Sequence, residues 1–139
     1  MVYQETITIT TTGRGTTNIT RQLEQQLKLS GITTGICNVF IRHTSASLIL
    51  CENADPAVRK DLETFLSTLV KDGNAAFQHD TEGDDDMPAH IRSILTECSL
   101  TLPISHGRFM LGTWQGVYLY EHRYSGFHRE VFITFYGEK

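Results

Sequence analysis

The sequence lacks the features that mark membrane proteins and nucleic-acid-binding proteins. No apolar run approaches the roughly 20 residues that a membrane-spanning helix needs, and the first residues have neither the basic nor the apolar region of a signal peptide. Lys and Arg number 12 against 16 Asp and Glu, and they form no basic stripe. We therefore expect no membrane partner and no nucleic-acid partner.

Cysteine is scarce, and a glycine-rich phosphate-binding motif is missing. Cys37, Cys51 and Cys98 are odd in number and have no Cys-x-x-Cys spacing, so we expect reduced core thiols in a cytoplasmic protein. Gly13-Arg14-Gly15 is too short to count as a glycine-rich phosphate loop. A phosphate site in this chain must therefore be built from side chains and strand-end amides.

The length and the hydrophobic content of the sequence predict a single domain covering residues 1–139. This length is typical of a single domain, and a hydrophobic content of 40% is enough for one core. The formal net charge is −4, but five of the sixteen acidic residues lie between residues 80 and 86. The acidity is therefore local.

Apolar residues recur with a period of two in some segments and of about four in others, which predicts strands and helices respectively. The predicted elements are a strand at 2–12, a helix from about 18 to 30, strands at 35–42 and 48–51, a helix from about 55 to 71, a short helix to about 97, and strands at about 99–104, 108–123 and 127–136. This order does not alternate as a doubly wound fold does. It predicts an α+β domain with a mixed, mostly antiparallel sheet, covered by two main helices plus a short third helix.

Two finer expectations follow from the same patterns. The last three strands are adjacent in sequence, which suggests an antiparallel meander. In the longest helix, five apolar residues share one stripe, which predicts a face buried in the core. These residues are Val58, Leu62, Phe65, Leu66 and Leu69.

The segment from His79 to His90 is the richest in chemically active side chains. It holds two histidines and five carboxylates, which are ligands that divalent metals take from proteins. Asp86 is placed to cap a helix that starts at Met87-Pro88. We therefore expect Asp85, rather than Asp86, to join His79 and His90 in binding Mg or Zn. The alternative is that the acidic run is a solvated loop.

A second polar segment, His43-Thr44-Ser45-Ala46-Ser47, lies between two apolar strand-like runs. Its polar groups need partners if the flanking strands are buried. One interpretation is a hairpin turn in which Ser and Thr bond to their own backbone. The other is a pocket in which the hydroxyls and His43 face a ligand.

An ion pair between Glu121 and Arg129 is predicted near the C-terminus. Alternation places Glu121 on the same face as Val117 and Leu119, and a short Tyr-Ser-Gly turn brings the strand of Arg129 close to it. The pair is either structural, at the end of a sheet, or it orients a ligand or a catalytic group.

Taken together, these segments resemble the YjbQ family, described as secondary thiamine-phosphate synthases. The matching stretches are His43-Thr44-Ser45-Ala46-Ser47, Glu52-Asn53, the region from Glu82 to His90, Gly112-Thr113-Trp114-Gln115, and Glu121 through Arg129. The resemblance implies a compact α+β subunit and a homotrimer whose sheets pack about a threefold axis. The implied activity joins a hydroxymethylpyrimidine diphosphate to a thiazole phosphate and yields thiamine phosphate and pyrophosphate.

For such a transferase we expect a polar pocket on which His43, His79 and His90 converge, with a divalent ion stabilising the leaving pyrophosphate. The expected catalytic residues are His43, His90, Glu121 and Arg129. The expected metal ligands are His79, Asp85 and His90. The expected substrate-binding residues are Thr44, Ser45, Trp114 and Gln115. Trp114 offers a face for stacking on a heteroaromatic ring, unless it belongs to the core.

Two other functions stay open at this point. The first is a metal-dependent phosphohydrolase that uses His79, Asp85 and His90 to activate water. The second is a non-catalytic trimeric module that binds a small anionic metabolite. Turnover of the two thiamine precursors favours the transferase, hydrolysis of a phosphoester without coupling favours the hydrolase, and saturable binding without turnover favours the module.

Overall fold

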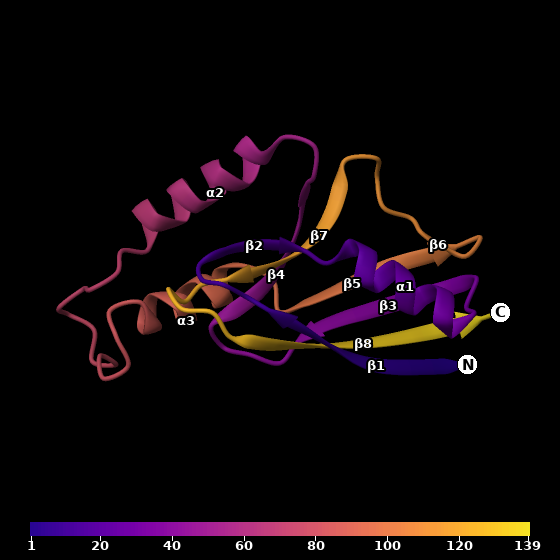
Figure 1. The fold of residues 1–139 in the computed structure, drawn as a ribbon, viewed down its shortest axis with the longest axis horizontal. Coiled ribbons are helices and arrows are strands. Elements are labelled where there is room, and N and C mark those ends of the chain that lie inside the picture. Colours follow the sequence, from indigo (N-terminus) through magenta and orange to yellow (C-terminus); the bar gives the residue numbers. More distant parts are fainter.

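The structure is a computed structural model that describes all residues from Met1 to Lys139. It contains three helices and eight strands (Figure 1). In chain order they are β1 (Val2–Thr10), β2 (Gly15–Asn18), α1 (Thr20–Ser30), β3 (Thr34–Ile41), β4 (Ala46–Glu52), α2 (Pro56–Leu69), α3 (Asp86–Leu95), β5 (Ser99–Ser105), β6 (Arg108–Phe109), β7 (Gln115–Glu121) and β8 (His128–Glu138).

The strands form two sheets, in which every pairing is antiparallel. The larger sheet has the order β1-β8-β3-β5-β6, and the smaller has the order β2-β7-β4. The α+β class and the three helices are confirmed. The strands divide between two sheets, however, and the expected C-terminal meander is wrong, because β7 pairs with β2 and β4 whereas β8 pairs with β1 and β3.

Alternation along β3 and β8 builds the core between the sheets. Cys37, Val39 and Ile41 of β3 face inward, and each is paired in register with an equally buried residue of β8. Leu23 and Leu27 of α1 join the same apolar cluster. Gly31 ends α1 with φ at 71°, a conformation that glycine adopts without a steric cost. α1 therefore covers the core as its spacing of four predicts.

The longest helix, α2, departs from expectation. It starts where predicted, because the Asp55 carboxylate accepts a hydrogen bond of 2.9 Å from the Ala57 N–H and Pro56 occupies the first turn. Figure 1 shows it running outside the two sheets. Of its apolar stripe only Leu66 is buried, whereas Phe65 is 63% and Leu69 is 58% exposed. The expected core face is therefore largely open in the single chain.

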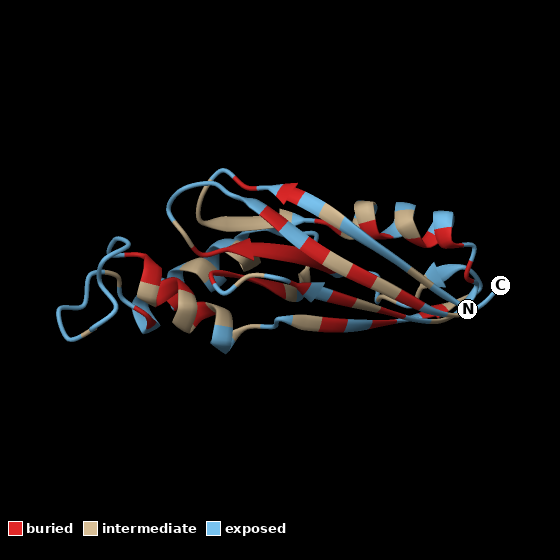
Figure 2. Ribbon diagram, turned by 90° about the horizontal axis from the view of Figure 1, so that it is seen from below, coloured by how far each residue is buried: buried red, intermediate tan, exposed pale blue.

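The segment between α2 and α3 is mostly exposed and forms the left end of the molecule in Figure 2, far from the two termini.

All three cysteines are free; Cys37 is buried and Cys98 is exposed, so the thiols do not all belong to the core. No helix combines the length and the apolar character that crossing a membrane requires.

Candidate metal centre

The N-terminal turn of α3 and the loop before it bring together three potential metal ligands. Asp86 and His90 are four residues apart and lie on the same face of the helix. The preceding loop folds back so that His79 Nε2 lies 2.6 Å from Asp86 Oδ2, and His90 Nε2 lies 3.3 Å from the same oxygen. One potential ligand atom of each residue lies within 4.8 Å of those of the other two. Atoms bound to one zinc ion lie about 3.4 Å apart, so small adjustments suffice.

His90 has its ligand nitrogen fixed by a neighbouring carbonyl. The Thr44 carbonyl accepts a hydrogen bond of 2.9 Å from His90 Nδ1, which must therefore carry the ring proton. In the neutral imidazole this leaves the Nε2 lone pair directed towards Asp86. The rings of His79 and His90 are 5.4 Å apart between centroids, which is close enough for both imidazoles to bind one metal ion.

Neither aspartate at the start of α3 has the role expected from the sequence, and no side chain caps the helix. Asp85 Oδ2 accepts hydrogen bonds from Arg123 Nε at 2.9 Å and from the Tyr124 N–H at 2.8 Å. Asp86 is not the cap but the first residue of the helix, and its Oδ2 faces the histidines. Asp86, rather than the expected Asp85, is therefore the aspartate that lies with His79 and His90, whereas Asp85 Oδ2 is engaged by Arg123 and the Tyr124 amide.

The carboxylate of Asp86 is held in its charged form. Burial by itself would raise its pKa, but the hydrogen bond with His79 and the charge of Arg123 keep the pKa below its ordinary value. Glu82 lies at the rim, with Oε2 3.4 Å from His79 Nε2. A pocket of about 200 Å³ adjoins the cluster and shares His79 as a lining residue.

Glu121 and Arg129 form the predicted ion pair, although their strands belong to different sheets. Arg129 Nε donates to Glu121 Oε1 at 2.8 Å, and Arg129 Nη2 donates to Oε2. Glu121 is fully buried, and its carboxylate also accepts from the Thr11 hydroxyl and from the backbone N–H groups of residues 122 and 123. The pair joins the end of β7 to the start of β8. Because these five hydrogen bonds engage both carboxylate oxygens, we interpret Glu121 as structural.

His43, Thr44 and Ser45 connect this ion pair to the candidate metal ligands, because Ser45 contacts Arg129 and the Thr44 carbonyl contacts His90. Ser45 is buried and accepts from Arg129 Nη2 at 3.0 Å, whereas Thr44 is exposed. His43 Nε2 accepts from the Glu130 N–H at 2.7 Å. Burial, and then the charge of Arg129, lower the pKa of His43, so it is neutral and its proton is on Nδ1.

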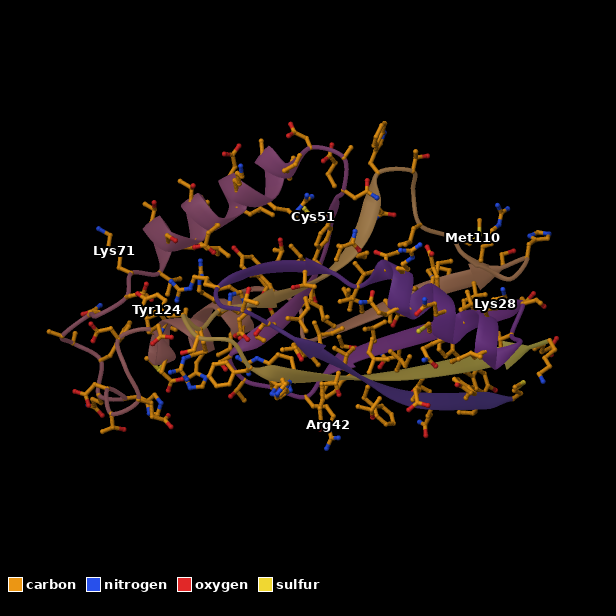
Figure 3. All side chains as sticks on the ribbon, viewed as in Figure 1. Lys28, Arg42, Cys51, Lys71, Met110 and Tyr124 are labelled. Carbon is orange, nitrogen blue, oxygen red and sulfur yellow. The ribbon has the colours of Figure 1, made fainter.

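Trp114 and Gln115 do not join this cluster within one chain. The register of the β4–β7 pair places Gln115 opposite Glu52 at one end and Glu121 opposite Ala46 at the other. At ~3.4 Å per residue these ends are about 20 Å apart. In Figure 3, Tyr124 lies beside α3, whereas Cys51 lies nearer the other end of the β4–β7 pair. Trp114 is 62% exposed, so it is not a core residue either.

Behind α3 lies a buried polar cluster that the sequence patterns did not indicate. Arg92 is fully buried, and its Nη2 donates to both carboxylate oxygens of Glu63 at 2.8 Å. The Tyr120 hydroxyl donates to Glu63 at 2.7 Å, whereas Arg92 Nε and Nη1 have no partner. Burial, and then the charges of three arginines, lower the pKa of the fully buried His122 to about 3, so its imidazole is neutral. Arg92 thus ties α3 to α2 on the side of the helix opposite His90.

Sequence reasoning missed three residues of the site. Asp86 was dismissed as a cap, although its spacing of four from His90 was a usable signal. Glu82 belonged to the acidic run but had no distinguishing spacing. Arg123 shares a strand face with Glu121 in the sequence pattern, but nothing local indicates that its side chain reaches α3.

The fold and this cluster define a class of protein: a small α+β domain of two antiparallel sheets with a two-histidine, one-carboxylate site at the start of a short helix. The family model described as UPF0047 protein YjbQ-like matches residues 5–138, and the chain belongs to that family. A UPF0047 protein of Synechocystis is 50% identical over 98% of this chain and 92% of its own length. The UPF0047 protein YjbQ of Salmonella typhimurium is 48% identical over 99% of this chain and 100% of its own.

Solved structures agree with this assignment. A YbjQ-like protein of unknown function from Sulfolobus solfataricus superimposes with a TM-score of 0.90 at 26% identity, covering 99% of both chains. A conserved hypothetical protein from Thermus thermophilus has a TM-score of 0.83 at 35% identity, covering 93% of this chain and 97% of its own.

These relatives correct one expectation. They are named only as UPF0047 or YjbQ-like proteins, and the Sulfolobus protein is described as being of unknown function. None of them is named as an enzyme of thiamine biosynthesis, so the description of the family by that pathway is wrong as a label for this chain. The YjbQ-like identity itself is confirmed.

Proposed function

We propose that this protein is a metal-dependent phosphohydrolase acting on small phosphorylated compounds, with one divalent ion held by His79, Asp86 and His90. The observation that carries the proposal is the convergence of three ligand atoms within 4.8 Å, from a helix and from the loop before it. Two imidazoles and one carboxylate suit zinc better than magnesium, which prefers an all-oxygen site.

The side chains around the cluster suit hydrolysis of a phosphoester. A divalent ion held by His79, Asp86 and His90 would polarise a phosphoryl oxygen and make a bound water more acidic. Glu82 is the exposed carboxylate next to His79, and we propose that it acts as the general base that accepts a proton from the attacking water. That water forms a new P–O bond while the bond to the alcohol breaks, and the departing oxygen takes up a proton from solvent.

A second group of donors lies on the other side of Thr44, whose carbonyl binds His90. Arg129 Nη1 forms no hydrogen bond within the chain, and Nδ1 of His43 carries a proton. Together with the Thr44 hydroxyl, these groups are suited to bind the oxygens of an anionic substrate. The Glu121 carboxylate offsets the charge of Arg129, so we expect the metal ion to provide most of the attraction for the anion.

Zinc titration of the metal-free protein tests the metal site. We expect saturable binding of one zinc ion per chain by calorimetry, and a loss of affinity of at least about 100-fold in His79→Ala, Asp86→Asn and His90→Ala, because each removes one of only three ligands. His106→Asn is the matched control, since His106 lies in the β5–β6 turn with φ of 53°, a conformation that asparagine tolerates. Absence of zinc binding by the wild type contradicts the proposal.

The same preparations test catalysis. Zinc-loaded wild type should hydrolyse p-nitrophenyl phosphate, a chelator should abolish the activity, and Glu82→Gln should lower kcat more than it lowers zinc affinity. Zinc and phosphate binding without any turnover contradicts the hydrolase and favours the non-catalytic anion-binding module instead.

We also propose that the chain acts as a cytoplasmic homotrimer. The outer face of the larger sheet supports self-association, because Ile36, Phe40 and Tyr136 are 45%, 43% and 62% exposed and lie on adjacent strands. Phe65 and Leu69 of α2 add a second exposed apolar surface. A closed ring of three requires two different patches on each copy, and these two surfaces supply them.

Light scattering tests this assembly. At micromolar concentration we expect a mass about three times the 15.7 kDa of the chain, and we expect Phe40→Asp to reduce it to that of one chain, because a carboxylate at the centre of an apolar interface is desolvated. Leu29→Asp is the control, since Leu29 is an exposed residue of α1 that belongs to neither of these two surfaces. A wild-type mass equal to one chain contradicts the assembly.

A further inference from the structure

Arg123 contacts three parts of the loop and helix that carry the candidate metal ligands. Its Nε donates to Asp85 Oδ2 at 2.9 Å, its Nη1 donates to Asp86 Oδ1 at 2.9 Å, and its Nη2 donates to the Glu82 carbonyl at 2.8 Å. Each of its three nitrogens has a different acceptor. The planar guanidinium, which presents donors in fixed directions, can span them at once.

These contacts determine which atoms face the metal ligands. Because Arg123 occupies Oδ1 of Asp86, the carboxylate presents only Oδ2 to His79 and His90. The bond to the Glu82 carbonyl fixes the backbone from which the Glu82 side chain reaches His79. Arg123 therefore sets the orientation of one ligand and the position of the rim carboxylate.

Arg123 is itself held by the buried ion pair. Its backbone N–H donates to Glu121 Oε2 at 3.2 Å, and the next N–H, that of Tyr124, donates to Asp85 at 2.8 Å. The Tyr124 hydroxyl in turn donates to Asp72 at 2.6 Å, just beyond the C-terminal end of α2. The end of β7 thus connects the interior of the protein to the start of α3 through the Arg123 side chain and the backbone N–H groups of Arg123 and Tyr124.

We propose that Arg123 is a positioning residue of the metal centre, which presents Asp86 Oδ2 to the ion and holds Glu82 beside it. This inference rests on the proposed function, because it concerns the same site. Groups that orient metal ligands typically change metal affinity by about 10- to 100-fold when they are removed. A role confined to folding would instead lower the thermal stability of the protein and leave the coordination of the ion unchanged.

Cobalt titration of metal-free Arg123→Met and Arg123→Lys distinguishes these roles. Co²⁺ replaces zinc in such sites, and its visible absorption reports the number and geometry of its ligands. We expect Arg123→Met to bind Co²⁺ about 10- to 100-fold more weakly than the wild type and with an altered spectrum. Arg123→Lys should restore affinity only in part, because one ammonium group cannot span three acceptors. Circular dichroism verifies that each variant is folded.

Arg42→Met is the matched control, since Arg42 forms an exposed pair with Glu130 at 3.1 Å and does not contact the ligand loop. It should bind Co²⁺ with wild-type affinity and spectrum. If the wild type binds no Co²⁺, the proposed metal centre itself is wrong. If the wild type binds Co²⁺ and folded Arg123→Lys matches it in affinity and spectrum, the metal centre stands and the positioning role of Arg123 is refuted, whether or not Arg123→Met folds.

Discussion

Replacing Arg129 by methionine should lower the free energy of unfolding by about 3–5 kcal/mol, the usual cost of removing one partner of a buried ion pair. Glu121 is fully buried, and Arg129 is only 4% exposed. The substitution leaves the Glu121 carboxylate in the interior with the Thr11 hydroxyl and two backbone amides as its remaining donors. Urea unfolding followed by circular dichroism measures the loss.

Two further variants make this result specific to the pair. The double variant Glu121→Gln with Arg129→Met should lose less stability than the sum of the two single losses, because the neutral amide does not leave a buried charge behind. Arg42→Met, which breaks an exposed pair, should cost no more than about 1 kcal/mol. A loss as small as this in Arg129→Met would show that water reaches Glu121 in solution.

The second large effect is expected where α2 meets α3. Glu63→Gln should destabilise the protein by about 3 kcal/mol, because it leaves the Arg92 guanidinium fully buried without a counter-charge. Arg92→Met should cost less, about 1–2 kcal/mol, since the Glu63 side chain is 32% exposed and its carboxylate can regain water. The order of the two losses, measured by urea unfolding, is the test, and the reverse order contradicts the interpretation.

The dependence of this effect on pH gives an independent check. Burial alone would raise the pKa of Glu63, but hydrogen bonds from Arg92, Ser67 and Tyr120 lower it below the ordinary value of 4.5. The folded protein therefore binds this proton less readily than the unfolded chain. The stabilisation is present above pH 4.5 and is lost as the pH falls through the lowered pKa. The difference in stability between wild type and Glu63→Gln should shrink over that range, whereas exposed Glu97→Gln should behave like wild type.

Local sequence patterns predicted most of the elements but not their partners. The strands at 35–42 and 127–136 and the helix from about 55 to 71 are close to β3, β8 and α2. The pairing of β8 with β1 and β3, rather than with β7, could not be read from the sequence. Sheet partners are determined by which apolar faces bury each other, and that depends on residues 90 or more positions apart in the sequence.

For the candidate site, too, the sequence predicted the segment that carries it but not the contacts made by its residues. His79 and His90 were identified because two histidines and five carboxylates in twelve residues form an unusual local composition. The choice between Asp85 and Asp86 was wrong because it depended on Arg123, which is 37 positions away in sequence from Asp86 but 2.9 Å away in the fold. Trp114 and Gln115 were grouped with the site by resemblance, whereas the length of β7 separates them from it within one chain.

The sequence by itself therefore determined the class of the fold, the ion pair of Glu121 with Arg129 and the segment that carries the candidate ligands. These follow from short-range properties: the period of apolar residues, the chemistry of helix ends and the length of one turn. Only the tertiary structure decided that the strands form two sheets, that α2 leaves most of its apolar stripe exposed, and that Asp86 faces the histidines. Each of these depends on side chains brought together by long-range packing, where a half-buried charge such as that of Arg123 pairs with the acceptors that the fold places within about 3 Å.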